Sequence, residues 1–258
     1  MIVTGTGTGV GKTVVTAALA AVSHAGAERT HDHGDGPTAA ARGAGAAVAV
    51  VKPAQTGVAG DEPGDLAEVR RLAGAVHTAE LARYPDPLSP EAAARTAGLP
   101  PLDHGAAVTA IRTLAAAHRD VIVEGAGGLL VRYAPDGWTL ADLATALRAP
   151  VVLVTGAALG TLNHTALTLA ALWSRGLALA GLVIGSWPAQ PGMTERNNLL
   201  DLETLAGQPL SGALPAGAGR LDGASFRRLA PLALAPWLGG SFDPARFRET
   251  NLPVKEPM

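Results

Sequence analysis

The chain has 258 residues, of which 48% are hydrophobic, and a formal net charge of −2. A chain of this length can bury a sizeable core, and its composition is typical of a globular protein rather than a disordered one. The near-neutral charge and the 3% aromatic content argue against a nucleic-acid surface, and the absence of cysteine excludes disulfides and thiol chemistry. No apolar run reaches the roughly 18 residues that span a bilayer, and Met1 leads directly into an apparent strand without a basic leader, so we expect a cytoplasmic protein that binds no membrane.

Short apolar runs rich in β-branched residues alternate with Ala/Leu-rich segments of helical spacing. The runs predict buried strands at 2–4, 47–51, 121–123, 151–154, 180–184 and 210–214. The segments between them predict helices at 13–23, 66–73, 106–118, 140–147, 165–175 and 195–206. Because strands and helices alternate, the pattern predicts a single α/β domain over residues 1–258, with a mostly parallel sheet and helices on both faces.

Three stretches lack this alternation. Residues 26–45 are rich in Gly, Ala and His without any periodicity, which predicts a flexible loop. Residues 84–101 contain five prolines, which predict an irregular but ordered excursion. One short helix is expected after Pro231, and residues 240–258 are expected to form a loosely ordered tail.

A glycine-rich turn that ends in Gly-Lys-Thr follows the first predicted strand, in MIVTGTGTGVGKT. Glycines let backbone N–H groups converge on phosphate oxygens, and the N-terminus of the following helix adds a favourable dipole. Lys12 can reach the β- and γ-phosphates of a nucleotide, while the Thr13 hydroxyl can bind Mg²⁺. Five residues rather than four separate Gly5 from Gly11, so the motif is a lengthened P-loop in the required strand–loop–helix context. We therefore expect a P-loop NTPase-like fold.

Lysine is scarce in this chain: three of the 20 basic residues are lysines, namely Lys12, Lys52 and Lys255. Lys52 ends the second predicted strand, in VAVVKPAQTG, at the edge of the sheet where α/β proteins bind their ligands. A compact ammonium group at this place suits a phosphate or a developing anion. The ordinary alternative is a surface lysine that lies along apolar side chains.

Two carboxylates are candidates for the same site. Glu124 ends the third predicted strand and precedes GAGG, so it can hold Mg²⁺ directly or through water. Asp65 lies near a predicted helix start, where a favourable interaction with the helix N-terminus is the alternative to a metal role.

The motifs VTGTGTGVGKT, KPAQTG, VEGAGG and LGTLNHT, in this order and spacing, resemble those of the dethiobiotin synthetases over residues 1 to about 221. The likeness is strongest to actinobacterial members, which share LVIGSWP. It implies a Mg-ATP-dependent ligase of biotin synthesis that carboxylates 7,8-diaminononanoate with CO₂. The carbamate would attack the γ-phosphate to form a carbamic–phosphoric anhydride, and the second amine would then close the ureido ring and release phosphate.

The resemblance also implies roles by position. Lys52 and Lys12 would be catalytic, and Thr13, Asp65 and Glu124 would hold Mg²⁺. The implied substrate contacts are Thr56, Gly160, Thr161, Leu162 and Asn163. The implied nucleotide contacts include Lys12, Thr13, Asp65 and Glu124. The others are Gly9, Val10, Gly11, Val14, Gly125, Ala126, Gly127, Gly185, Ser186, Pro215, Ala216 and Gly217.

In the family, residues 159–165 come from the neighbouring subunit of a homodimer, so each site would be shared across a two-fold interface. The start of a helix in this segment has free N–H groups that suit the distant carboxylate of the substrate. The simpler alternative is that Asn163 is the N-cap of that helix, which is compatible with both readings.

Two positions depart from the family pattern. Gly9 replaces a glutamate that many relatives carry, which removes a carboxylate from the loop and should raise its affinity for phosphate. Gly185, followed by Ser186, replaces an asparagine whose amide reads adenine, and glycine has no amide with which to do so. We therefore expect relaxed base selectivity, with any recognition coming from the backbone around residues 185–186 and 215–217.

Two other classes share the phosphate loop. The P-loop amidoligases that carry a glutaminase domain need a cysteine nucleophile, which this chain does not have. A partition or septum-site ATPase, which is a nucleotide switch that binds DNA or membrane, has a signature lysine where Thr4, Gly5 and Thr6 stand here. Phosphate release that depends on the diamine would indicate the synthetase, and release without it would indicate the switch.

Overall fold

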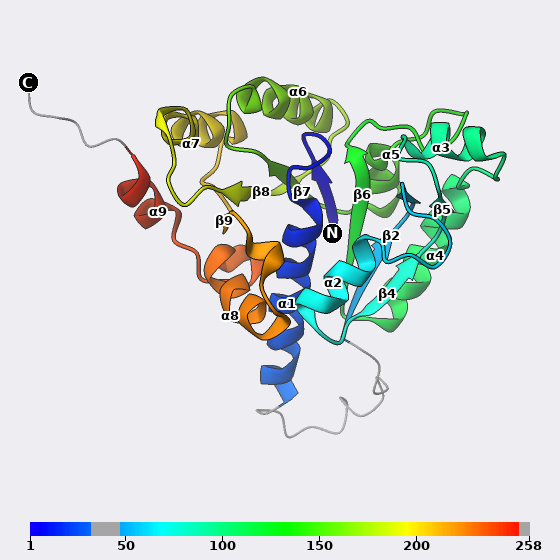
Figure 1. Cartoon of the computed structure of the whole chain (residues 1–258), viewed down its shortest axis with the longest axis horizontal. Helices are drawn as coiled ribbons and strands as arrows, with labels where there is room; N and C mark the ends of the chain where they lie inside the picture. The colour runs from blue at the N-terminus through cyan, green and yellow to red at the C-terminus, as the bar shows by residue number, and fades with distance from the viewer. Residues whose placement is uncertain (32–46, 253–258) are drawn as a thin grey trace, which may run out of the picture.

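The computed structural model describes residues 1–31 and 47–252 (Figure 1). Its main sheet has seven strands in the order β4-β2-β6-β1-β7-β8-β9, and all neighbouring pairs are parallel. These strands are β1 Ile2–Gly5, β2 Val48–Lys52, β4 His77–Glu80, β6 Asp120–Gly128, β7 Val151–Thr155, β8 Leu179–Trp187 and β9 Gly212–Pro215. A separate parallel pair consists of β3 Gln55–Thr56 and β5 Arg83–Tyr84.

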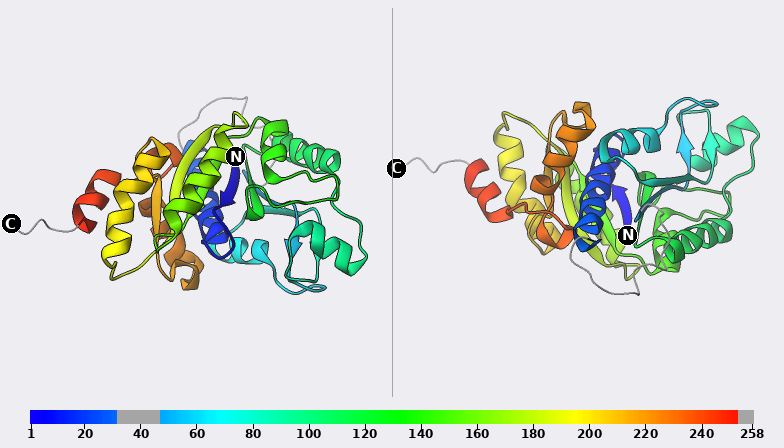
Figure 2. Two further views of the ribbon diagram at one scale, coloured as in Figure 1. Left: turned by 90° about the horizontal axis from the view of Figure 1, so that it is seen from above. Right: turned by 90° about the horizontal axis from the view of Figure 1, so that it is seen from below.

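Helices cover both faces of this sheet, as the two views in Figure 2 show. One layer contains α1 Lys12–His31, α2 Asp65–Ala73 and α8 Gly223–Ala233. The other contains α4 His104–Ala117, α5 Leu140–Leu147, α6 Thr161–Trp173 and α7 Met193–Ala206. The fold class predicted from the sequence, a single α/β domain with a parallel sheet between helices, is confirmed. No helix within the described ranges is long and apolar enough to cross a bilayer.

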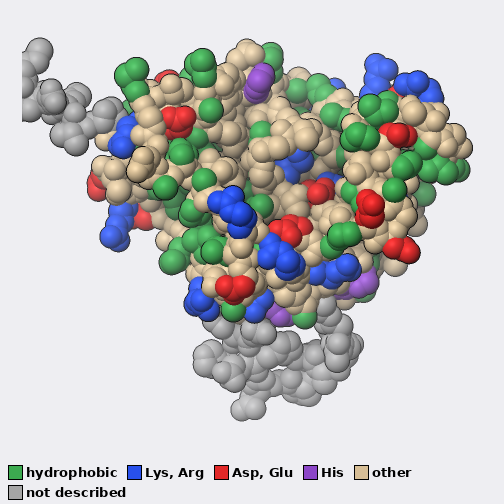
Figure 3. Space-filling model, in the orientation of Figure 1, with side chains coloured by type: hydrophobic (Ala, Val, Ile, Leu, Met, Phe, Trp, Pro, Cys, Tyr) green, Lys and Arg blue, Asp and Glu red, His purple; other side chains and the backbone are tan. Residues whose placement is uncertain are grey.

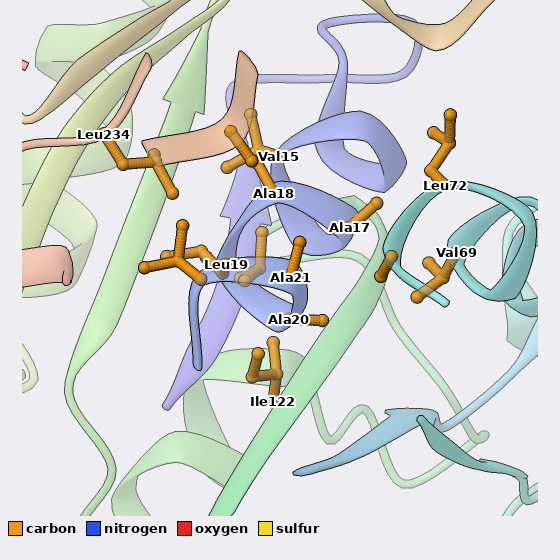
Figure 4. Close-up of a cluster of buried hydrophobic side chains, with 14 of the residues drawn as sticks. Val15, Ala17, Ala18, Leu19, Ala20, Ala21, Val69, Leu72, Ile122 and Leu234 are labelled. Carbon is orange, nitrogen blue, oxygen red and sulfur yellow. The ribbon is translucent and has the colours of Figure 1, made fainter. Parts of the chain in front are cut away.

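Successive side chains of each buried strand point to opposite faces of the sheet, so they belong to two different hydrophobic clusters. Val3 belongs to the cluster beneath α1, α2 and α8, whereas its neighbour Ile2 belongs to the cluster beneath α4 and α5. In β2, Val50 and Val51 divide in the same way. Figure 4 shows the side chains of α1 lying among those of α2 and the sheet. An all-apolar strand therefore buries both of its faces, as a parallel sheet requires.

Two irregular stretches contain more regular structure than the sequence predicts. Helix α1 continues to His31, so residues 26–31 of the expected flexible loop are helical, and the remainder of that loop lies outside the described residues. The proline-rich stretch 84–101 contains helix α3, Pro90–Ala97. Its first residue is a proline, whose fixed φ suits the first turn of a helix, and Gly98 ends the helix in the left-handed conformation.

The expectation of a loosely ordered tail from residue 240 is wrong for residues 240–252. Helix α9, Pro244–Asn251, has Asp243 as its N-cap, and the Asp243 side chain accepts hydrogen bonds from two backbone N–H groups. The indole of Trp187 donates to Asn251 Oδ1 at 3.2 Å, and Arg248 pairs with Glu203 at 2.6 Å. These contacts attach the helix to β8 and α7, while residues 253–258 lie outside the described range.

Candidate active site

The glycine-rich segment 5–11 joins β1 to α1 at the carboxyl end of the sheet. The Thr6 N–H donates to the Val154 carbonyl at 3.0 Å and fastens the loop to β7. Gly9 and Gly11 have φ values of 78° and 96°, a region that favours glycine. A Cβ on Gly11 would lie 2.7 Å from the Gly185 carbonyl oxygen, so the loop packs backbone to backbone against β8. This close packing holds the loop at the start of α1, where its N–H groups can meet phosphate.

Lys12 begins α1 and folds back over the loop. Its Nζ donates to the Gly7 carbonyl at 2.8 Å, and the side chain is buried. Burial lowers the pKa of Lys12, and the positive charge of Lys52 lowers it further, whereas Glu124 and Asp65 act in the opposite direction. Two lysines therefore converge on one place, which is an arrangement that an anionic ligand would stabilise.

Lys52 ends β2 and lies between two carboxylates. Its Nζ lies 2.5 Å from Asp65 Oδ2 and 2.9 Å from Glu124 Oε1, and the residue is 3% exposed. Burial lowers the pKa of Lys52, but the two carboxylates more than compensate, and the net direction is upward. The ammonium group is therefore charged throughout the neutral range, and the surface-lysine alternative is excluded by its burial.

The oxygen atoms around Lys52 fit a magnesium ion. Glu124 is 0% exposed, and its Oε1 accepts from the Thr13 hydroxyl at 2.8 Å. Its other oxygen, Oε2, is buried without a hydrogen-bond partner among the described residues, which leaves an anionic ligand atom available for a cation. Carboxylate and hydroxyl oxygens are the ligands that Mg²⁺ prefers, and it usually completes its shell with water and nucleotide phosphate. Within residues 1–31 and 47–252, no group of three or more His, Cys, Asp or Glu side chains is arranged so that it could hold a metal ion.

A buried tyrosine supports the turn that follows Glu124. The Tyr133 hydroxyl oxygen accepts from the Ala126 N–H at 2.9 Å, and burial raises the pKa of this tyrosine. Its ring stacks on Trp138 with the centroids 4.5 Å apart. A Cβ on Gly125 would lie 2.3 Å from Leu140 Cδ2, so any other residue there would force the buried Leu140 side chain to move. The sequence gives no sign of Tyr133, because its contact depends on how the chain returns after β6.

One cavity of about 810 Å³ beside the phosphate loop is lined by the two lysines and by the candidate magnesium ligands Thr13, Asp65 and Glu124. Figure 3 shows the face of the molecule that carries α1 and α2, where basic and acidic side chains lie next to one another near its centre. Residues 87–90, which precede and begin α3, form part of the wall. The predicted residues that line the cavity are Gly9, Gly11, Lys12, Thr13, Val14, Lys52, Thr56, Asp65, Glu124, Ala126 and Gly127.

The predicted substrate segment 160–163 does not line this cavity of its own chain. Gly160 is the N-cap of α6, with φ 91°, so the N-cap role considered for Asn163 is wrong, and Asn163 is an exposed residue of the first turn. The Thr161 hydroxyl donates to the Gly156 carbonyl at 2.8 Å and bonds to Thr155, which gives this side chain a structural role. The segment therefore reaches an active site only if it serves another molecule.

The predicted base-contacting segments meet at the ends of β8 and β9. The Ala216 N–H donates to the Trp187 carbonyl at 2.7 Å, which joins the two strand ends. A Cβ on Gly185 would lie 2.0 Å from the Val10 carbonyl oxygen, so no side chain fits at 185 unless the phosphate loop moves. This close approach between the two backbones gives a packing reason for a glycine at position 185.

Arg71 links α2 to the turn that follows β9. Its guanidinium donates to the Leu221 carbonyl at 2.7 Å and also to the Gly219 carbonyl, while Glu68 holds it from the side. A Cβ on Gly219 would lie 3.1 Å from Val14, so this turn also touches the first turn of α1. The hydrogen bonds therefore connect residues 219 and 221, which follow the predicted base-contacting residues 215–217, with the helix that carries Asp65.

Comparison with known proteins identifies the family. Residues 1–218 match the model of a family described as an AAA domain. The ATP-dependent dethiobiotin synthetase BioD of Parafrankia sp. is 58% identical over 200 residues, which are 78% of this chain and 84% of that protein. The enzyme of the same name from Streptomyces coelicolor is 56% identical over 205 residues, covering 80% and 86% of the two chains. This chain belongs to the dethiobiotin synthetase family.

Solved structures that resemble this dethiobiotin synthetase family member at low identity support the fold alone. A ParA family ATPase from Chlorobium tepidum superposes with a TM-score of 0.50 at 15% identity, over 92% of this chain and 94% of that chain. The Aquifex aeolicus MinC:MinD cell division complex gives a TM-score of 0.50 at 11% identity, over 99% and 98% of the chains. The expected P-loop NTPase-like fold is thereby confirmed.

Proposed function

We propose that this chain is an ATP-dependent dethiobiotin synthetase that carboxylates 7,8-diaminononanoate with CO₂ and closes the ureido ring. The name of its relatives at 56–58% identity supports the proposal. The structural observation that carries it is the convergence of Lys12 and Lys52 on one cavity beside the phosphate loop. Phosphoryl transfer depends mainly on positioning and charge neutralisation, which two buried lysines can provide without a protein nucleophile.

In the proposed reaction, the substrate supplies the nucleophiles and the two lysines stabilise negative charge. One amine of the diamine attacks CO₂ and loses a proton, and the carbamate oxygen so formed attacks the γ-phosphorus of ATP as ADP leaves. The second amine then attacks the carbonyl carbon of this anhydride, and inorganic phosphate leaves. Lys52, kept charged by Asp65 and Glu124, stabilises negative charge on the carbamate and on the transferred phosphoryl group. Lys12 exchanges the Gly7 carbonyl for phosphate oxygens, and the Thr56 hydroxyl faces the substrate.

Thr13, Asp65 and Glu124 would hold Mg²⁺, which when bound neutralises the charge of the nucleotide phosphates. Two observations support this assignment: Glu124 Oε2 has no hydrogen-bond partner among the described residues, and the Asp65 carboxylate is 37% exposed. The same cavity is lined by Gly9, Gly11, Lys12, Thr13, Val14, Ala126 and Gly127. Backbone N–H groups at the start of α1 suit the phosphate chain.

The decisive experiment measures phosphate release by the purified chain with diaminononanoate, bicarbonate, Mg²⁺ and ATP, and identifies the organic product by mass spectrometry. We expect release that requires the diamine and a product with the mass of dethiobiotin. Release at the same rate without the diamine would instead support a nucleotide switch, which is the alternative that the shared fold keeps open.

We infer that the nucleotide base is weakly selected. Gly185 offers no side chain, and its Cα packs against the Val10 carbonyl, so the base can meet only backbone atoms and Ser186 on this side. Thermal-shift titrations with ATP, GTP and CTP should give stabilisation of similar size for the three nucleotides. A response to ATP alone would refute relaxed selectivity.

We also infer that the chain works as a homodimer in which residues 160–163 complete the partner's site. Exposed leucines support this arrangement: Leu167 of α6 is 62% exposed and lines one hollow together with Leu130, which is 47% exposed. Leu159, two residues before α6, is 91% exposed. The hollow, of about 430 Å³, is also lined by residues 6–8 of the phosphate loop. A two-fold contact there would bring each α6 N-terminus to the other subunit's loop.

Leu167→Asp is expected to convert the dimer to a monomer, because it places a charge among the exposed leucines. We expect diamine-dependent phosphate release to fall by at least about tenfold while ADP still produces a thermal shift. Sedimentation velocity measures the change. Leu232→Asp is the matched control, since Leu232 is 65% exposed on α8, across the sheet from α6. An active monomer, or a dimer that survives Leu167→Asp, would contradict the shared site.

A further inference from the structure

Helix α2 carries Asp65 as its first residue and has no cap of its own. The residue before it, Gly64, occupies the N-cap position and has no side chain to accept a hydrogen bond. N-cap positions usually hold Ser, Thr, Asp or Asn, because the first N–H groups of a helix need an acceptor. The acceptor for α2 must therefore come from elsewhere in the chain.

That acceptor is the side chain of Gln55, on β3. Its Oε1 accepts from the Asp65 N–H at 2.9 Å, and its Nε2 donates to the Thr56 carbonyl at 3.1 Å. Gln55 is 4% exposed, and its own N–H donates to the Ala82 carbonyl at 2.9 Å. Because both ends of the amide are bonded, its orientation is fixed.

The glycine at 64 is explained by the same contact. A Cβ on Gly64 would lie 2.6 Å from Gln55 Oε1 and 2.8 Å from Cδ. The backbone of Gly64, at φ −97° and ψ −166°, is extended and open to any residue, so conformation does not require glycine there. The lack of space requires it, because a side chain at position 64 would overlap the Gln55 amide in its observed position.

We propose that Gln55 is a positioning residue, which caps α2 from β3 and thereby sets the Asp65 carboxylate against Lys52. The carboxylate lies 2.5 Å from Lys52 Nζ, so a shift of the first turn of α2 moves one member of the buried ion-pair group. Gln55 stands between Lys52 and Thr56 in KPAQTG, and its amide joins the start of α2 to the Thr56 carbonyl. The part of the inference that concerns Mg²⁺ rests on the proposed function, whereas the cap itself does not.

The test is a double-mutant cycle of Gln55→Ala and Gly64→Ser. Each single change should lower Tm by about 2–4 °C, the first by removing the cap and the second by its clash with Gln55. In the double variant the serine has room and an N-cap geometry, so it should recover most of the Tm. Gln55→Met, which keeps the volume but removes the acceptor, should resemble Gln55→Ala and excludes a cavity effect.

The second readout is the Mg²⁺ concentration that half-saturates ADP binding, measured calorimetrically without diamine. Gln55→Ala and Gln55→Met should raise it by about three- to tenfold, while ADP binding in EDTA stays unchanged and the double variant returns toward wild type. Unchanged Mg²⁺ dependence, or a Gly64→Ser penalty as large in the Gln55→Ala background as in wild type, would overturn the proposal. Failure of wild type to form dethiobiotin would refute the proposed function instead and leave the Tm cycle untouched.

Discussion

Lys52→Ala is expected to reduce diamine-dependent phosphate release by at least about 10³-fold while ADP binding changes by less than about tenfold. In the proposed mechanism the Lys52 ammonium group meets the developing charge, whereas the phosphate loop and Lys12, which line the same cavity, would hold the nucleotide. Phosphate release under saturating substrates and calorimetric ADP titration measure the two effects. A fully active variant would refute the catalytic assignment of Lys52.

The structure adds a stability effect to this prediction. Lys52 is the cation that compensates Glu124, which is 0% exposed, so its removal leaves a buried carboxylate unpaired. Breaking a buried pair on one side costs about 3–5 kcal/mol. We therefore expect a lower Tm for Lys52→Ala and a larger gain in Tm on addition of Mg²⁺ than wild type gives, because the metal replaces the lost charge.

Lys52→Arg separates stability from catalysis. Arginine keeps a positive charge between Asp65 and Glu124, so most of the Tm should remain, but its planar fork cannot take the place of a compact ammonium group. Turnover should therefore stay low in a folded variant. A well-folded Lys52→Arg variant with full turnover would indicate that charge alone is sufficient.

The sign of the pH dependence follows from the pKa of Lys52. Because the two carboxylates raise it in the folded state above its unfolded value, the ion pairs contribute to stability below about pH 10.4 and lose this contribution only above it. Unfolding free energies between about pH 6 and 9 should thus show no step from Lys52, and any activity profile in that range reports other groups or the substrate amines.

The sequence was informative where function depends on short motifs at strand ends. The P-loop, Lys52 and Glu124 each follow an apolar run, and parallel strands bring their carboxyl ends to one edge, so the cluster could be expected before the structure was known. The sheet between two helical layers was predictable for the same reason, since unbroken β-branched runs bury both faces.

What escaped prediction depends on contacts between distant segments. Strand β4, His77–Glu80, is polar because it is an edge strand, so it has no apolar run to find. The capping amide of Gln55 and the guanidinium of Arg71 look like ordinary polar residues until α2 is placed beside them. The tail was misjudged because α9 has no buried residue of its own and is held by Trp187 and Glu203, far away in sequence.

Lys12→Ala is expected to weaken nucleotide binding and turnover together, by about 10²-fold or more each, because the proposed role of this lysine is to contact phosphate in both the bound and the reacting state. The charge state of Lys12 should also make nucleotide binding depend on pH. Burial, and then the charge of Lys52, lowers its pKa in the free protein, whereas a bound polyphosphate favours its charged form. Nucleotide binding at alkaline pH should therefore take up a proton.

The affinity for ADP should accordingly fall as pH rises through the lowered pKa of Lys12, with a limiting slope of about tenfold per pH unit. Calorimetry in two buffers of different ionisation enthalpy, repeated at a series of increasingly alkaline pH values, measures the proton uptake directly. Lys12→Arg is the control: its guanidinium stays charged across this range, so both the slope and the uptake should disappear even if binding is weaker. Proton uptake that persists in Lys12→Arg would assign the titration to another group. It would also contradict the inference that a bound anion stabilises the charged form of Lys12 beside Lys52.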